Sequence, residues 1–141
     1  MNTLVIFYSY SGHTKAIATD IAAKESADIL EVKEAKRRGK FRAYTAGIFA
    51  SIKGTTWPIQ PLDTDLAQYD RLILLSPVWA SNPPPPFNAL LQILPEGKTI
   101  SVKMISGSGK SECKERLEAA IQSRGSVLES LEDIKAKDYG K

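Results

Sequence analysis

Unbroken apolar runs mark the strands that the sequence predicts most clearly. Residues 4–8 are apolar throughout, and residues 71–76 are apolar between a leading arginine and a final serine. Such runs are typical of parallel strands that helices cover on both faces. Weaker patterns predict three further strands, at 29–33, 98–105 and 126–134.

Apolar stripes at helical spacing predict helices between these strands. The segment 14–25 carries one stripe, formed by Ile17, Ala18, Ile21 and Ala22. Further helices are predicted at 44–53, 87–94 and 111–123. Cys113 shares an apolar face with Leu117, Ala120 and Ile121, so we interpret it as a core residue rather than a nucleophile.

The alternation of strand and helix predicts an α/β fold, a doubly wound parallel sheet in one domain covering residues 1–141. Five strands fit the order 2-1-3-4-5, in which the first and third strands are neighbours. The helices that follow these two strands then lie on opposite faces, and ligands bind beyond the carboxyl ends of the strands at this switch point.

The strand at 98–105 differs from the others because its pattern alternates. Apolar side chains at positions 100, 102 and 104 alternate with Ser101 and Lys103. This pattern indicates that one face of the strand is not fully covered. Three alternatives follow: the face is exposed, the segment 34–56 covers it, or it is buried in a homodimer.

Three polar loops follow strands that end at the same edge of the predicted sheet. The first lies between an apolar strand and a helix start, where unpaired N–H groups and the helix dipole favour a phosphate. We expect it to meet the loop after 71–76 and the loop after 98–105. In chain order the candidate residues are Ser9, Tyr10, Ser11, Gly12, His13 and Thr14, then Pro77, Val78, Trp79, Ala80, Ser81 and Asn82, then Ser106, Gly107, Ser108 and Gly109.

Composition excludes several classes of protein. The chain has 43% hydrophobic residues, 25% charged residues and a formal net charge of +3, which is ordinary for a globular protein and no argument for nucleic acid. No apolar run approaches the ~18–20 residues of a membrane span. A single cysteine excludes an intrachain disulfide and a thiolate metal cluster, and no metal site is predicted. We expect a cytoplasmic protein without a signal peptide.

One segment is unusually basic. Lys33, Lys36, Arg37, Arg38, Lys40 and Arg42 fall within ten residues, with one glutamate among them. This cluster is either a solvated loop or a patch for an acidic partner or a phosphorylated cosubstrate.

Common phosphate-handling motifs are incomplete. The sequence Gly109-Lys110-Ser111 resembles the end of a P-loop, but Met104 stands where the first motif glycine is required. A response regulator needs carboxylates at the strand ends, where this chain has Ser9 and Ser76. A cysteine phosphatase needs a thiolate in the phosphate loop, whereas Cys113 falls in the predicted helix 111–123. A serine hydrolase with a Gly-x-Ser-x-Gly elbow is not supported either, because the sequence lacks that motif.

The chain resembles the flavodoxin family in its three loops and over most of its length. The matching residues are Tyr8–Thr14, Ser76–Trp79 with the prolines and Phe87–Leu91 that follow, and Ser106–Gly109. The resemblance implies a flavodoxin-like fold and an FMN cofactor. It implies that residues 9–14 hold the flavin phosphate, that 77–82 flank the isoalloxazine ring, and that 106–109 approach its other edge.

Two roles of Trp79 stay open: it stacks on or shields the ring, or it anchors its loop to the sheet. The family commonly carries Asn at the position of His13, and it usually ends with a fifth helix. The segment after Ile134 is too short and too polar to form that helix.

The resemblance leaves three functional hypotheses. The first is an oxidoreductase that passes electrons from a reduced nicotinamide to a quinone or a similar acceptor. The second is a one-electron carrier that docks to redox partner proteins. The third is a binding module with this fold and no flavin.

Overall fold

The computed structural model describes residues 2–36 and 40–140. Arg37 and Arg38 of the predicted basic cluster lie outside these residues, whereas Lys33 and Lys36 are exposed. In chain order the elements are β1 (Thr3–Tyr8), α1 (His13–Glu25), β2 (Asp28–Val32), α2 (Lys40–Lys53), the 3-10 turn η1 (Leu66–Gln68), β3 (Arg71–Pro77), α3 (Pro85–Leu91), β4 (Thr99–Ser106), α4 (Lys114–Ser123), β5 (Val127–Lys135) and the 3-10 turn η2 (Ala136–Asp138).

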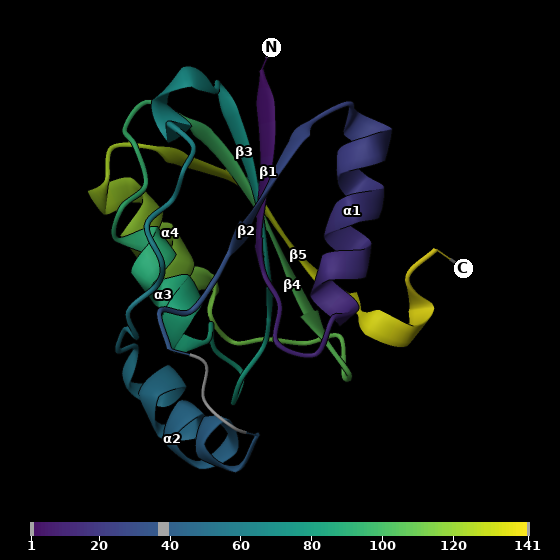
Figure 1. Ribbon diagram of the computed structural model, residues 1–141, viewed down its shortest axis with the longest axis vertical. Helices are drawn as coiled ribbons and strands as arrows, with labels where there is room; N and C mark the ends of the chain where they lie inside the picture. Colours follow the sequence, from purple (N-terminus) through teal and green to yellow (C-terminus); the bar gives the residue numbers. More distant parts are fainter. Residues whose placement is uncertain (1, 37–39, 141) are drawn as a thin grey trace.

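The five strands form one parallel sheet in the order β2-β1-β3-β4-β5, which confirms the predicted topology. At the centre, Ile6 of β1 pairs with Leu30 of β2 on one side and with Leu74 of β3 on the other. The helix α1 covers one face, and α3 and α4 cover the other (Figure 1). None of the described helices is long and apolar enough to cross a membrane.

Each face of the sheet has its own apolar core. On the side of α1, Phe7 and Leu75 pack against Ile17 and Ala18, and all four are buried. On the side of α3 and α4, Leu74 and Val102 belong to a larger cluster that also contains Phe87, Leu117 and Cys113. Cys113 is therefore a core residue, as predicted, and burial raises the pKa of its thiol.

All four helices start at different residues from those that the sequence predicts. Helix α1 begins at His13 instead of Thr14, and α2 begins at Lys40 instead of Tyr44. Helix α3 begins at Pro85 instead of Phe87. Proline suits a first helical turn, because its missing N–H would have no intrahelical acceptor there. Helix α4 begins at Lys114 instead of Ser111, and Cys113 is its N-cap. Residues 107–113 therefore form a longer loop than predicted at the edge where ligands bind in this topology.

Of the three alternatives for the alternating face of β4, cover by the segment 34–56 is wrong. Its helix α2 lies on the opposite side, near α3 and α4 (Figure 1). Arg116 of α4 holds it there by donating to the carbonyl oxygens of Ser51 at 2.7 Å and Ile52 at 2.9 Å. Carbonyls in the last turn of a helix have no intrahelical donor, so the guanidinium also completes the end of α2.

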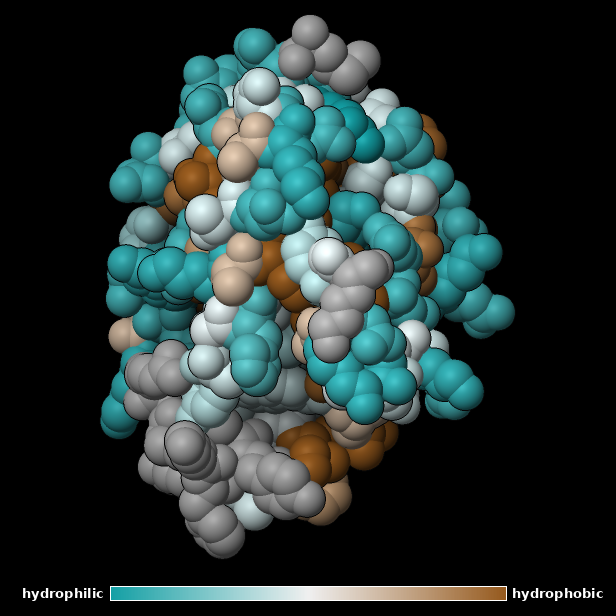
Figure 2. Space-filling view, turned by 90° about the vertical axis from the view of Figure 1, so that its right-hand side faces the viewer, coloured by the Kyte–Doolittle hydropathy of each residue, from teal (hydrophilic) through white to brown (hydrophobic). Residues whose placement is uncertain are grey.

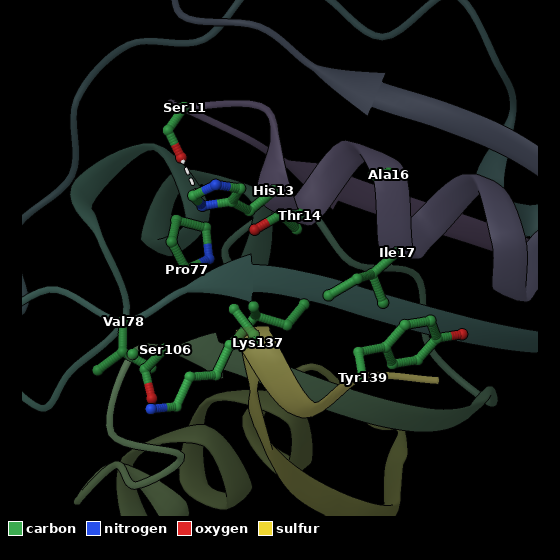
Figure 3. Close-up of a pocket in the computed structure, with 13 residues that line it drawn as sticks. Ser11, His13, Thr14, Ala16, Ile17, Pro77, Val78, Ser106, Lys137 and Tyr139 are labelled. Atoms are coloured by element: carbon green, nitrogen blue, oxygen red, sulfur yellow. Dashed lines mark hydrogen bonds between the residues drawn. The ribbon is translucent and has the colours of Figure 1, made fainter. Parts of the chain in front are cut away.

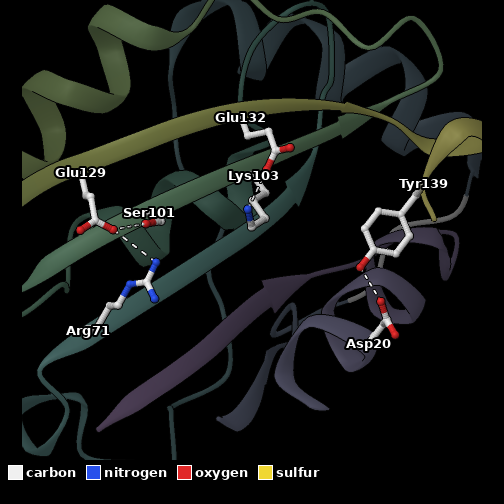
Figure 4. Close-up of polar contacts among 7 residues, drawn as sticks. All are labelled: Asp20, Arg71, Ser101, Lys103, Glu129, Glu132 and Tyr139. Atoms are coloured by element: carbon white, nitrogen blue, oxygen red, sulfur yellow. Dashed lines mark hydrogen bonds and ion pairs between the residues drawn. The ribbon is translucent and has the colours of Figure 1, made fainter. Parts of the chain in front are cut away.

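Polar side chains of β3, β4 and β5 cover part of the β4 face on the side of α1. Lys103 pairs with Glu132 at 2.7 Å, and Glu129 accepts from Ser101 at 3.1 Å and from Arg71 at 3.3 Å (Figure 4). This side of the molecule has a largely hydrophilic surface (Figure 2). Among the residues described, only η2 and the residues up to 140 follow β5.

The Glu129 carboxylate is expected to stabilise this face. Ser101 is only 2% exposed, so Glu129→Ala leaves its hydroxyl without an acceptor and should lower the free energy of unfolding by about 1 kcal/mol. Urea denaturation measures the change. Glu129→Gln retains an oxygen acceptor and should cost less, and Glu118→Ala on the exposed side of α4 is the matched control. An equal loss for both Glu129 variants would contradict the role of the hydrogen bond.

Candidate functional site

The Ser9 side chain determines how the loop between β1 and α1 is folded. Its Oγ accepts the N–H of Gly12 at 3.1 Å and the N–H of Lys15 at 3.3 Å. Gly12 has φ 100°, a left-handed conformation that side chains rarely adopt, and an added Cβ there would face open space. Ser9 therefore caps α1, and Gly12 lets the chain turn into the helix.

This capping leaves donors at the start of α1. The N–H groups of His13 and Thr14 have no hydrogen-bond acceptor within the described part of the chain. The Ser11 hydroxyl lies 3.4 Å from Nδ1 of His13, and Thr14 is 3% exposed. Unpaired N–H groups beside hydroxyls at a helix start provide the donors that an anion requires.

A cavity of about 640 Å³ adjoins these donors. Its size falls within the roughly 300–1,000 Å³ that is typical of small-molecule sites. All three predicted loops contribute to its lining: Ser11, His13 and Thr14, then Pro77 and Val78, then Ser106 and Gly107 (Figure 3). The structure thus brings together seven of the sixteen candidate residues around one cavity.

The other nine predicted residues do not line this cavity. Ser9, Tyr10 and Gly12 shape the first loop. Residues 79–82 form a tight turn in which Trp79 and Asn82 exchange N–H···O bonds of 2.8 and 3.0 Å. Ala80 and Ser81, at the tip of that turn, both have positive φ, 50° and 65°. Non-glycine residues in this region are strained, and such strain often accompanies function.

Trp79 is held by aromatic neighbours. Its ring lies edge-on to Tyr8, Tyr10 and Trp57, with ring centroids 6.2, 5.8 and 6.0 Å away. An added Cβ on Gly47 of α2 would come within 2.7 Å of the indole. These contacts agree with the anchoring role, and a stacking role on a bound ring remains a prediction.

The loop after β4 is ordered by its own side chains. The Ser106 hydroxyl accepts the N–H of Gly109 at 2.9 Å, and the Ser108 hydroxyl accepts the N–H of Lys110 at 3.3 Å. Gly109 has φ 75° and lies against Lys135, where an added Cβ would be 3.0 Å from the lysine Cβ. Gly107 lines the cavity, and an added Cβ there would meet open space.

The segment after β5 is not among the site residues that the sequence predicts. Ala136, Lys137 and Tyr139 line the cavity, and Figure 3 shows Lys137 and Tyr139 beside it. The predicted strand order could have placed this segment at the site, because the carboxyl end of every parallel strand lies at the same edge of the sheet. The polar composition of this tail made it resemble a solvated terminus instead.

Tyr139 attaches the tail to α1. Its hydroxyl donates to Asp20 at 2.5 Å (Figure 4). The Lys24 ammonium lies 5.7 Å from its ring centroid. This hydrogen bond, followed by one from Lys24, lowers the pKa of the Asp20 carboxyl. Burial, followed by the hydrogen bond to Asp20, raises the pKa of Tyr139.

The Tyr139–Asp20 hydrogen bond should make stability depend on pH. Because the folded pKa of Asp20 is lowered, its stabilisation is present above the unfolded value of about 4 and is lost as pH falls through the folded pKa. Tyr139→Phe removes the main cause of that shift. Lowering the pH from about 6 to about 3 should therefore lower the melting temperature of the wild type more than that of the variant. Thermal unfolding curves at the two pH values measure the difference. Parallel curves for the two proteins would contradict this assignment.

No protein-family model and no curated protein matches the chain. Several solved structures share its fold. A flavoprotein from Lactobacillus acidophilus NCFM, crystallised in complex with FMN, is 23% identical, with a TM-score of 0.68 and 99% of both chains covered.

Two flavodoxins are also similar. One, from Streptococcus pneumonia TIGR4, is 18% identical with a TM-score of 0.58 over 94% of this chain and 83% of that one. The other, flavodoxin 2 from Bacillus cereus, is 20% identical with a TM-score of 0.53 over 93% and 82%. The chain therefore has the flavodoxin-like α/β fold that the sequence predicts.

Proposed function

We propose that this chain is an FMN-binding redox protein that holds the flavin phosphate at the start of α1. The observation that carries the proposal is the cavity of about 640 Å³ whose lining includes His13 and Thr14, the two residues at the start of α1 whose N–H groups are unpaired within the described part of the chain. Among the lining residues there is no aspartate or glutamate, so the lining suits an anionic ligand. The FMN complex of the Lactobacillus acidophilus flavoprotein, which shares this fold, supports the same ligand.

In this proposal each loop has a separate task. His13 and Thr14 donate backbone N–H groups to the phosphate, and the hydroxyls of Ser11 and Thr14 add further donors. Pro77 and Val78 provide an apolar wall, and Gly107 allows a close approach of the backbone. A bound flavin would supply the electron-transfer chemistry, whereas the protein would set its orientation and the charge around it.

The phosphate assignment can be tested at Thr14. Thr14→Val preserves the shape of the side chain and removes its hydroxyl, so FMN affinity should fall about 10–100-fold. Riboflavin, which has no phosphate, should bind nearly as well as before. Thr19→Val on the same helix is the matched control, since its hydroxyl donates to the Lys15 carbonyl. Fluorescence titration measures the affinities of the wild type and both variants for FMN and for riboflavin. An equal loss for both ligands in Thr14→Val would contradict phosphate binding at Thr14.

The proposed reaction is electron transfer from a reduced nicotinamide to a quinone or a similar acceptor. The exposed side chains of Lys33 and Lys36 support a phosphorylated cosubstrate. An electron carrier with partner proteins has the same cavity and is the second candidate. We also propose a cytoplasmic, single-domain protein and leave a homodimer as a further proposal.

Steady-state kinetics distinguish the two candidates. The FMN-loaded protein should oxidise NADH or NADPH in the presence of a quinone, and the rate should saturate with the nicotinamide. Lys33→Glu combined with Lys36→Glu should raise KM for the nicotinamide while leaving FMN affinity unchanged. Absence of turnover with both nicotinamides would reject the enzyme and favour the carrier.

A further inference from the structure

Lys137 places a positively charged side chain beside the cavity, and it comes from the segment after β5 rather than from the three predicted loops. It lies in η2 and lines the cavity. Its side chain extends toward Ser106, away from Thr14 (Figure 3). Within residues 2–36 and 40–140, Lys137 takes part in no ion pair.

The backbone on both sides of Lys137 is fixed. Before it, Lys135 belongs to β5 and contacts Gly109, and Ala136 packs against the core on the side of α1. After it, Tyr139 packs against the same core and donates to Asp20. The lysine side chain therefore leaves the tail from a position that β5 and α1 both determine.

The donors at the two ends of the cavity are of different kinds. The start of α1 offers the neutral N–H groups of His13 and Thr14. The end near Ser106 has the ammonium group of Lys137, and no lining residue is a carboxylate that could neutralise it. In the proposed function the phosphate occupies the first end, so the ring of the flavin lies toward the second.

We propose that the Lys137 ammonium group stabilises the negative charge of the reduced flavin ring and so raises the reduction potential of bound FMN. This inference rests on the proposed function. Two electrons and one proton convert the neutral oxidised ring into a reduced ring with one negative charge. The lysine keeps its three protons and forms no covalent bond, so its contribution is purely electrostatic. It acts on the reduced state far more than on the oxidised state, whose ring is neutral.

The test compares Lys137→Gln, Lys137→Arg and the control Lys114→Gln. The control makes the same charge change at an exposed residue of α4, on the opposite face of the sheet. The two-electron midpoint potential of bound FMN is measured at about pH 7 by dye-equilibrated titration, together with the Kd values of oxidised FMN and riboflavin. Lys137→Gln should weaken binding of reduced FMN about tenfold relative to oxidised FMN, which corresponds to a potential lower by about 30 mV. Lys137→Arg and Lys114→Gln should keep the wild-type potential.

The outcomes separate this inference from the function on which it rests. Normal FMN binding with an unchanged potential in Lys137→Gln would overturn the inference alone. If Lys137→Gln lost affinity for oxidised FMN but kept its affinity for riboflavin, the inference would also be overturned, because Lys137 would then bind the phosphate. Failure of the wild type to bind FMN would overturn the proposed function and the inference with it. An equal shift of the midpoint potential in Lys114→Gln would mean that the potential depends only on the net charge of the protein, and it would overturn the role of Lys137.

Discussion

The hydroxyl of Ser9 accepts two N–H groups at the start of α1 and thereby determines which donors are left for a ligand. With the N–H groups of Gly12 and Lys15 satisfied by one oxygen, those of His13 and Thr14 are unpaired among the described residues. The left-handed Gly12 allows this turn. Because β1 is next to β3 in the sheet, these donors lie near Pro77 and Val78, and the cavity forms between them.

The second constraint is the sheet face beside α1. Where a helix could cover β4 and β5, the chain instead pairs Lys103 with Glu132 and joins Ser101 and Arg71 through Glu129. Paired charges at a partly exposed surface add little stability each, but they let the face meet water without unpaired polar groups. The space also admits the tail, whose Lys137 and Tyr139 reach the cavity.

Local patterns predicted the sheet well because the strands are parallel and buried. The unbroken apolar runs at 4–8 and 71–76 require covered faces, and both strands lie at the centre of the sheet. The alternation of Ser101 and Lys103 with apolar neighbours was equally informative about the face beside α1. Strand order then predicted that three loops meet, and each contributes residues to the cavity.

The remaining features depend on contacts between distant residues. Nothing in the segment 34–56 indicated that Arg116 would hold α2 beside α4. The position of Trp79 depends on Trp57 and on the absence of a side chain at Gly47. The tail has no periodicity, and its place beside α1 depends on the hydrogen bond from Tyr139 to Asp20 and on the packing of Ala136 and Tyr139 against the core.

The central claim is that the cavity beside α1 holds FMN, and the visible absorption spectrum tests it most directly. The purified protein, or the protein after addition of FMN and removal of excess ligand by gel filtration, should show the absorption bands of oxidised flavin. They should correspond to one FMN per chain, and the flavin fluorescence should change on binding. A colourless protein that retains no added FMN would contradict the account.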